Sequence, residues 1–549
     1  MLENVETATN KAEPPTRSAP AWMGMLSGVA AAAIALGFGQ LIEGVSATIP
    51  GLVLGVGELV IDYTPGWAAE ESIESLGTAG KGNLLLGITI VSFVLAAFIG
   101  DVALRRGDRF GIVAFAAFGL LGGWATARNP QSPLVASWFW AFVATGLGAM
   151  TLRFLLHQAR RTTHAPVTTV ADGMVTASPL DPPRSRRAFL GFSAGAGAVA
   201  LTGVGVGRVA QGTGAGDVAR AGVVLPDVAA DASTTTALAE RTTGTVQTEP
   251  FDIPGLSRWV TPSTNDQFYR IDTALQYPQI DPAEWSLAIT GMVDNPYELT
   301  YDELLGMDLV ERTITLSCVS NPVGGELVGN AVWTGVPLVD LLDRAGVQEG
   351  ATQLVGRSVD DFTAGFPTET LYDGRNALLV VGQNGEPLQV RHGFPARLVI
   401  AGLYGYVSAT KWIEEINLTT WEGFNGYWVN LGWAKEGPMK ITSRIDVPAH
   451  RARIEAGLTP IAGVAWSPVQ GIEAVEISID DGEWQICDLA VPGTDETWVQ
   501  WRTEWEATPG VHRIDVRAID KTGALQPVGP KDVAPDGAEG YHAVLVEIV

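Results

Sequence analysis

The chain contains two cysteines, and one of them stands where a site residue is expected. Cys318 ends the segment Arg312–Cys318, whose alternating apolar and polar residues predict a half-buried strand. Asn321-Pro322 and Gly324-Gly325 follow and predict a turn. A thiol at the tip of a strand, just before a loop, is well placed for chemistry, although a free cysteine is more often a small buried apolar residue. The local pattern leaves both interpretations open.

A second group of polar residues comes later in the sequence. The segment His392–Arg397 reads His-Gly-Phe-Pro-Ala-Arg, and Lys411-Trp412 follows the next apolar run. Arginine and histidine are donors that suit an anionic group. The alternative for each of them is an ordinary surface ion pair.

The elements that must position these residues are of mixed type. Residues 337–346 begin with Pro337 and end with Gly346, and are predicted to form a short capped helix. Asn384-Gly385 lies between apolar runs and predicts a hairpin. Strand-like and mixed patterns start near Phe251 and continue to the end. Residues 208–250 are rich in Gly, Ala, Thr and Asp, lack aromatic residues, and are predicted to be a flexible linker.

Composition limits the classes of protein that need to be considered. A chain of 549 residues has room for roughly three to four domains. The formal net charge of -25 argues against nucleic acid as a partner, because phosphate binding needs a basic face. Two cysteines in different predicted domains exclude a disulfide scaffold.

The first 207 residues are predicted to be a membrane domain. Basic loops at 105–109 and 153–187 should be cytoplasmic, whereas the acidic segment 43–82 should lie outside. Five spans with the N-terminus inside satisfy these charges and place everything after residue 207 outside. The predicted spans, each about the 20 residues that a bilayer needs, are 22–42, 83–104, 110–127, 134–156 and 188–207.

The start of the last span resembles a twin-arginine export signal. Arg186-Arg187 lies within Ser185–Gly191 and runs into an apolar stretch rich in Gly and Ala. Such a signal is an address for export of proteins that have already folded. It predicts a folded, cofactor-loaded part after it. The alternative is that both arginines are ordinary positive-inside charges.

Two further features of the membrane domain bear on its role. The run Ile49–Ile61 is short and contains Glu58, so we expect it to be interfacial or re-entrant and not a span. A transmembrane haem needs histidine ligands inside apolar runs, and the only histidines before residue 250 are His157 and His164. We therefore predict no haem, and an anchor in preference to an electron conduit.

Residues 251–435 resemble the molybdopterin domain of the sulfite oxidase family, and 436–549 resemble its immunoglobulin-like domain. The first resemblance rests on Trp285–Gly291, the strand ending in Cys318, Val336–Leu338, Asn384–Leu388, His392–Arg397 and Lys411-Trp412. The second rests on Ser443–Pro448 and Gly510–Asp520. The fold expected from this resemblance is a transmembrane helical bundle, an α+β molybdopterin domain and an all-β sandwich.

The resemblance implies a molybdenum cofactor and a set of residues that hold it. Cys318 would supply a thiolate to molybdenum, and Cys487 would be structural. Because the match around Asp361 could slip by one residue, Asp360 is its alternative. The implied cofactor-binding residues are Phe268, Tyr269, Arg270, Asp361, His392, Arg397, Thr410 and Lys411.

The chain departs from true sulfite oxidases at the substrate residues. Ser320–Val323 stands where those enzymes have an arginine, and Val381 stands where they have a tyrosine. Among the family's substrate-binding residues, only Arg270 is in place, so sulfite is a doubtful substrate. Cys318 and Arg270 are the expected catalytic residues. The direction of oxygen-atom transfer stays open, and the alternative function is a non-catalytic envelope module that binds through a degenerate pocket.

The expected partners follow from this architecture. They are a small-molecule substrate, a separate cytochrome or quinone-linked electron carrier, the lipid bilayer and no nucleic acid, with a homodimer possible for the C-terminal domain. The expected location is the cell membrane, crossed several times, with the catalytic domain extracytoplasmic.

Overall fold

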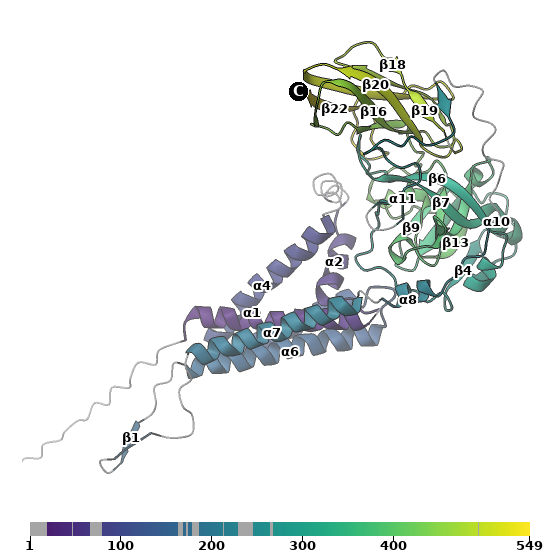
Figure 1. Cartoon of the computed structure of the whole chain (residues 1–549). Coiled ribbons are helices and arrows are strands. Elements are labelled where there is room, and N and C mark those ends of the chain that lie inside the picture. The colour runs from purple at the N-terminus through teal and green to yellow at the C-terminus, as the bar shows by residue number, and fades with distance from the viewer. Residues whose placement is uncertain are drawn as a thin grey trace, which may run out of the picture. The chain divides into compact units, whose positions relative to one another are not determined.

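The chain forms two compact units, which are described separately. The computed structural model describes residues 19–46, 48–65, 68, 80–162, 168–171, 174–177, 186–211, 214–228, 245–263, 267–491 and 493–549. The helical unit comprises residues 1–63 and 81–213, and the β-rich unit comprises 64–80 and 214–549 (Figure 1).

Long apolar helices make up the helical unit. They are α1 (Ala21–Val45), α4 (Gly80–Arg106), α5 (Asp108–Thr126), α6 (Leu134–Arg161) and α7 (Arg186–Gln211), with a short α2 (Leu52–Asp62) and a hairpin of β1 (Thr168–Ala171) and β2 (Met174–Ala177). By length and composition, 5 described helices could cross a membrane. They overlap the five ranges expected to span a membrane, with somewhat different ends. α2 has 11 residues, or about 16 Å of helix, which is too short to cross.

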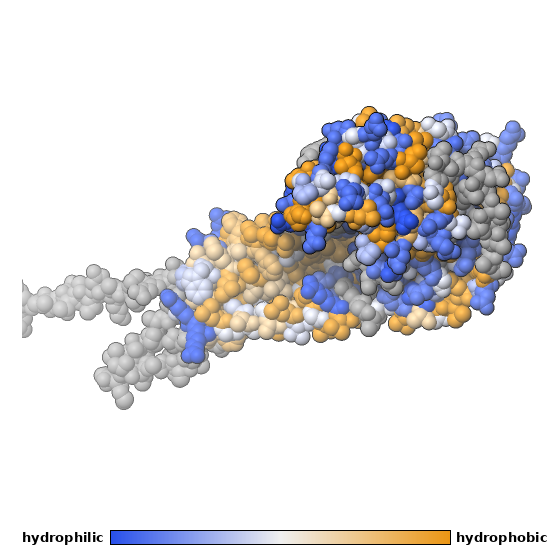
Figure 2. All heavy atoms as spheres, turned by 45° about the horizontal axis from the view of Figure 1, so that its top comes forward, coloured by the Kyte–Doolittle hydropathy of each residue, from blue (hydrophilic) through white to orange (hydrophobic). Residues whose placement is uncertain are grey.

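Small residues allow these helices to approach closely. A Cβ on Gly28 of α1 would lie 1.8 Å from the carbonyl oxygen of Ala96 in α4. A Cβ on Gly44 would lie 2.2 Å from the carbonyl oxygen of Gly207 in α7. Such contacts are typical of helices that associate in lipid, where small residues replace a hydrophobic driving force. Apolar residues also dominate the visible surface of this unit in Figure 2.

Two five-stranded sheets form the first part of the β-rich unit. One has the order β11-β10-β7-β6 with β12 also on β10, and the other has the order β5-β4-β13-β8-β9. Only β4 and β13 pair in parallel here. The strands are β4 (Ser286–Gly291), β5 (Tyr297–Thr300), β6 (Val310–Ser317), β7 (Val328–Pro337), β8 (Gln353–Ser358), β9 (Thr363–Pro367), β10 (Ala377–Gln383), β11 (Glu386–Pro387), β12 (Arg397–Ile400) and β13 (Ile413–Thr419).

Short helices connect these strands, and two local predictions are confirmed. Helix α10 (Leu338–Ala345) follows Pro337 and stops at Gly346, whose φ of 70° is left-handed. Asn384 and Gly385 both have positive φ in the β10–β11 hairpin. The other short elements are α9 (Tyr301–Leu305), η3 (Thr368–Leu371), η4 (Val390–His392), α11 (Gly405–Ser408) and η5 (Val429–Leu431).

The sheet that carries β6, β7 and β10 is buried on both faces. Leu379 and Val381 of β10 face a core shared with the second sheet. Leu378 and Val380 face a separate core that includes Phe268. This explains why β10 reads as a continuous apolar run and does not alternate. The second core is the one beneath the predicted site.

The C-terminal part consists of two further five-stranded sheets that share one apolar core. Their orders are β14-β16-β20-β19-β3 and β15-β22-β21-β17-β18. The strands are β14 (Thr442–Val447), β15 (Arg453–Ile454), β16 (Gly457–Trp466), β17 (Ile472–Ile479), β18 (Gln485–Ile486), β19 (Asp488–Ala490), β20 (Val499–Ala507), β21 (Gly510–Asp520) and β22 (His542–Ile548). Cys487 is buried in this core, as expected of a structural cysteine.

The predicted linker 208–250 is not simply flexible, and this expectation is corrected where the chain is described. Residues 214–228 contain α8 (Ala215–Ala221) and lie against the first part of the β-rich unit; we call them the strap. Farther on, β3 (Val246–Gln247) pairs in parallel with β19. The prediction failed because a Gly- and Ala-rich composition does not prevent docking: Ala219 and Val223 pack against the core, and Arg220 donates to backbone carbonyls. Residues 212–213 and 229–244 lie outside the described residues.

Candidate functional site

The site begins at Cys318, directly after the last residue of β6. Its thiol is free and 7% exposed. The Cys318 N–H donates to the Leu327 carbonyl at 2.9 Å, and the Cys318 carbonyl accepts from Asn321 N at 3.1 Å. Asn321 Oδ1 in turn accepts from Leu327 N at 2.9 Å. The loop between β6 and β7 thus closes on itself and holds the cysteine backbone at its base.

The pKa of the Cys318 thiol is raised overall. Burial raises its pKa, while hydrogen bonds from Ser320 and the positive charge of Lys411 lower it. In the ligand-free protein the sulfur stays protonated, and a bound metal would displace the proton. Ser320 was not singled out as a sulfur-binding residue from the sequence, because a serine in a turn has no distinctive pattern.

His392 is buried at the end of η4 with an unsatisfied ring nitrogen. It is 1% exposed, and its Nε2 has no hydrogen-bond partner among the described residues. The ring stands edge-on to Phe268, with centroids 5.7 Å apart. Burial lowers the pKa of His392 to about 2, helped by four nearby cations. The imidazole is therefore neutral. We call those cations the cation cluster: Lys411, Arg397, Arg391 and Arg270.

Arg397 is a buried guanidinium with no carboxylate partner in the described part of the chain. It is 4% exposed and donates only to the carbonyls of His392 at 3.1 Å and Leu398 at 3.4 Å. It also lies 5.3 Å from the centroid of the Trp333 ring. Burial lowers its pKa to about 10. A buried cation in this state is a strong donor set for an anion.

Gly393 brings the His392–Arg397 segment against Lys411. Its φ is 109°, and a Cβ there would lie 3.1 Å from the Cβ atoms of both Arg397 and Lys411. A larger residue could not adopt this backbone without strain. The two motifs that the sequence separates are therefore neighbours in the fold.

Lys411 and Thr410 lie on the other side of this contact. Lys411 Nζ donates to Asp272 Oδ2 at 2.9 Å and to the Arg391 carbonyl at 3.2 Å. Asp272 was missed in the sequence, although it follows Arg270 by two positions. Thr410 is fully buried, and its Oγ1 donates to the Gly356 carbonyl at 3.5 Å. Thr410 therefore packs the base of the site.

Three consecutive residues, two aromatic and one basic, lie next to His392 and Cys318. Phe268 is buried and stacks on Tyr269, with centroids 5.3 Å apart. Burial and the charge of Cys318 raise the pKa of Tyr269, whereas the charge of Arg397 lowers it. Tyr269 thus lies near both groups. Arg270 is exposed and lies 5.4 Å from the centroid of the Tyr277 ring.

Asp361 is placed differently from the other predicted residues. Its side chain is 62% exposed and lies 3.6 Å from Arg357, on the surface. Asp360 is partly buried, and its pKa is raised by burial and by the negative charge of Asp272. Of the two neighbouring aspartates, Asp360 is therefore the one close to the Lys411–Asp272 pair.

Tyr404 is a residue that sequence reasoning missed. Burial raises its pKa to about 12, and the charge of Cys318 adds to this effect. Its phenol oxygen accepts from Lys440 N at 3.4 Å. Tyr404 follows the last strand of its sheet by only a few residues, which is the one signal that could have pointed to it.

A metal at Cys318 would need ligands from a cofactor. No group of three or more His, Cys, Asp or Glu side chains that could hold an ion is found within the described residues. One thiol, an unsatisfied imidazole nitrogen and an unpaired guanidinium fit a bound group that is anionic, polar and itself supplies metal ligands. A large organic cofactor with a phosphate meets these requirements.

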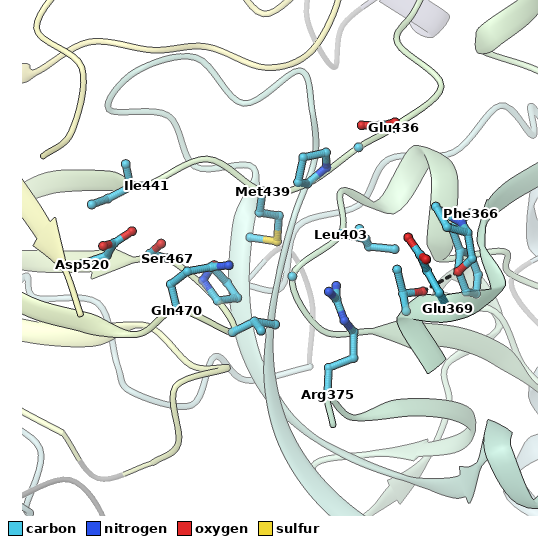
Figure 3. Close-up of a pocket in the computed structure, with 17 residues that line it drawn as sticks. Phe366, Glu369, Arg375, Leu403, Glu436, Met439, Ile441, Ser467, Gln470 and Asp520 are labelled. Atoms are coloured by element: carbon cyan, nitrogen blue, oxygen red, sulfur yellow. Dashed lines mark hydrogen bonds between the residues drawn. The ribbon is translucent and has the colours of Figure 1, made fainter. Parts of the chain in front are cut away.

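A separate cavity of ≈ 480 Å³ lies elsewhere in the β-rich unit. Figure 3 shows Phe366, Glu369 and Arg375 on one side and Gln470 and Asp520 on the other. None of the predicted site residues lines it. Arg375 is already engaged, because it donates to Asp373 and to the Ala401 carbonyl. The cavity is therefore distinct from the site at Cys318.

Known proteins resemble this part of the chain. Residues 274–428 match the family described as the oxidoreductase molybdopterin binding domain. Nitrate reductase [NADH] 1 of Oryza sativa subsp. japonica is 30% identical over 314 residues, covering 46% of this chain and 34% of that protein. The nitrate reductase [NADH] of Spinacia oleracea is 29% identical over 308 residues, covering 44% and 33%. The chain thus spans about a third of the length of these relatives.

A solved structure is also similar in part. The sulfane dehydrogenase SoxCD from Paracoccus pantotrophus is 23% identical, with a TM-score of 0.44. The match covers 49% of this chain and 77% of that one.

Proposed function

We propose that this chain, a molybdenum-dependent oxidoreductase of the sulfite oxidase family, is anchored in a membrane and works on its outer side. The reaction would be a two-electron oxygen-atom transfer. The observation that carries the proposal is that Lys411 acts electrostatically on the Cys318 thiol and is also one of the four cations around His392, whose ring nitrogen is unsatisfied. The sulfur suits molybdenum, and the donors suit a pterin that carries a phosphate.

Each residue would have a stated task in this site. Cys318 would bind molybdenum through its thiolate. Arg397 and His392 would donate to the anionic and polar groups of the pterin, and Lys411 would add a charge-assisted donor from its buried pair with Asp272. Arg270, the exposed cation, would orient an incoming oxyanion or a pterin oxygen. When bound, the cofactor supplies the oxygen-atom transfer itself.

The substrate is proposed to be other than sulfite. Near Cys318 the loop offers Ser320, Asn321 and Val323 and no arginine side chain of its own. A small dianion needs converging positive charge, whereas Lys411 is the one member of the cation cluster that acts on the Cys318 thiol, and it is already paired with Asp272. The plant relatives are named for nitrate, a monoanion, so nitrate joins sulfoxides and N-oxides as a candidate oxygen donor.

The orientation of the helical unit is proposed from its charges. Arg160 of α6 pairs with Asp108 at 2.6 Å, at the turn between α4 and α5. This pair supports placing the basic segments 105–109 and 153–161 on the same side of the membrane, which would be the cytoplasmic side. Trp22 of α1 and Phe189 of α7 have ring centroids 5.8 Å apart, which supports the same side for the N-terminus and the twin arginines. The β-rich unit would then be outside.

The test is metal and pterin analysis of the purified full-length protein. The proposal expects molybdenum and pterin in near-equal amounts, and turnover with an artificial electron carrier and one of nitrate, a sulfoxide or an N-oxide, but not with sulfite. Preparations from cells able to make the cofactor that contain neither molybdenum nor pterin would favour the alternative, a non-catalytic envelope module. The absence of turnover with a loaded protein would refute the substrate classes alone.

A further inference from the structure

The loop that follows Cys318 is held from outside by the C-terminal part of the β-rich unit. Gly325 lies near the end of this loop, and its carbonyl oxygen accepts a hydrogen bond of 2.7 Å from Arg444 Nη1. Arg444 belongs to β14, in a different sheet from β6, the strand that leads to Cys318. A residue far along the chain thus makes the contact.

Arg444 is itself rigidly placed. Its Nε donates to Asp446 Oδ1 at 2.7 Å, and its Nη2 donates to Ser257 Oγ at 2.8 Å. Asp446 Oδ2 accepts from Ser257 N at 3.0 Å, which closes the network. The Arg444 and Asp446 side chains are each 8% exposed. Because they are two residues apart on a strand, both project to the same face.

The same part of the chain presses on the loop at a second point. A Cβ on Gly324 would lie 2.3 Å from Cδ2 of His542 and 2.4 Å from its Nε2. His542 Nδ1 accepts from Ile445 N at 3.0 Å, so the ring is oriented by the residue next to Arg444. Gly324 also has a positive φ of 76°, which disfavours any side chain there. Arg444 therefore holds the carbonyl of Gly325, and the ring of His542 packs against Gly324.

A short path leads from this contact to the sulfur-bearing residue. Leu327 is two residues after Gly325, and its carbonyl holds the Cys318 N–H at 2.9 Å. Its N–H binds Asn321 Oδ1, and Asn321 N binds the Cys318 carbonyl. A shift of Gly325 would therefore move both hydrogen bonds that hold the Cys318 backbone.

We propose that Arg444 is a positioning residue for the Cys318 loop, through which the C-terminal part of the chain sets the orientation of the Cys318 sulfur. The proposal rests on the proposed function in one respect, that Cys318 binds molybdenum. Arg444 does not touch the reacting atoms. Its effect passes through Gly325 and Leu327, as second-layer contacts commonly tune a metal ligand.

The test compares Arg444→Met with a matched control in the full-length, cofactor-loaded protein. The control is Arg513→Met, because Arg513 also pairs with an aspartate two residues along its strand, Asp515 on β21, at 2.7 and 2.6 Å, but is more exposed and does not hydrogen-bond to the Cys318 loop. The measurements are the Mo(V) electron paramagnetic resonance spectrum and hydrogen exchange of the amides in 319–327. A merely structural role would lower stability without changing the spectrum.

We expect Arg444→Met to shift or broaden the Mo(V) signal and to speed exchange of the loop amides at least tenfold, with Arg513→Met like wild type. An unchanged spectrum and exchange within twofold of wild type in Arg444→Met would overturn the proposal. If Arg444→Met does not fold, Gly324→Ala decides, because it displaces the loop without removing a charge. A wild-type spectrum in Gly324→Ala would then overturn the proposal. A wild-type protein with no molybdenum would instead refute the proposed function.

Discussion

Replacing Arg397 should have opposite effects on stability and on cofactor content. The change is Arg397→Met, which keeps an unbranched side chain of similar length and removes the charge. In the cofactor-free protein the guanidinium is buried without a carboxylate partner. Burying this charge lowers the free energy of unfolding. With a pterin phosphate bound, the same charge would be favourable.

The magnitude follows from the pKa of this group. Burial lowers the pKa of Arg397 to about 10 from an ordinary 12.5. At about 1.4 kcal/mol per pH unit, holding the charge corresponds to roughly 3 kcal/mol. The substitution also gives up two hydrogen bonds to carbonyls, worth about 0.5–1.5 kcal/mol each. The net expectation is a gain of about 1 kcal/mol in the free energy of unfolding, or a rise of about 1–2 °C in Tm for a unit of this size.

The assay uses full-length protein made with and without cofactor synthesis. Thermal unfolding of the cofactor-free protein gives the stability change, and fluorescence of the oxidised pterin gives cofactor content. Arg357→Met is the control, because Arg357 is 42% exposed and already pairs with Glu415 at 3.1 Å. We expect it to keep its pterin and to gain no stability.

An anion-binding role for Arg397 would be refuted by a less stable variant that still binds pterin. If Arg397→Met lowers the Tm of the cofactor-free protein by several degrees and retains a full complement of pterin, Arg397 is a structural residue. Loss of pterin together with a higher Tm is the outcome that only an anion-binding role explains.

Two other predictions follow from the same contacts. The folded-state pKa of His392 is about 2, against an ordinary 6.5. Between these values the unfolded chain binds a proton that the folded chain does not. The free energy of unfolding therefore falls as the pH drops below about 6.5. In urea titrations of cofactor-free protein, His392→Gln should therefore reduce this slope by about 1.4 kcal/mol per pH unit between pH 6 and 4, and an identical slope would contradict the buried neutral imidazole. Arg220 of the strap donates to the carbonyls of Pro387 and Leu388 at 3.0 Å and to Glu386 at 3.1 Å. Arg220→Ala should therefore speed hydrogen exchange in 386–392 and release pterin faster. The control is Arg453→Ala, which removes an exposed ion pair and should do neither. Equal pterin release from both variants would contradict a role for the strap.

Local patterns predicted the pieces of the site well. The strand that ends before Cys318, the helix after Pro337 and the hairpin at Asn384-Gly385 depend on periodicity and on the φ preferences of a few residues. Such signals lie within ten residues of one another, so a single sequence carries them. The joining of Lys411 to the His392–Arg397 segment is different, because it requires knowing that a Cβ cannot fit at Gly393.

What the sequence could not predict are the contacts between distant segments. Asp272 has no motif, and its role depends on Lys411 reaching it across the fold. The strap docks through Gly216 N, which donates to Gln279 Oε1 at 2.9 Å, through Arg220 on backbone carbonyls, and through Ala219 and Val223 against the core. These few contacts form no apolar period that the sequence would show. Arg444 lies in a strand of another sheet, and nothing near Cys318 in the sequence points to it.

The central claim is that the Cys318 sulfur binds molybdenum, and X-ray absorption at the molybdenum edge tests it most directly. The two free cysteines provide a matched pair, because Cys318 and Cys487 are both buried and only Cys318 is near the cation cluster. We predict that Cys318→Ser retains pterin but shows one sulfur neighbour fewer around molybdenum than wild type, whereas Cys487→Ser shows the wild-type number. The same number of sulfur neighbours in Cys318→Ser and wild type would contradict the account.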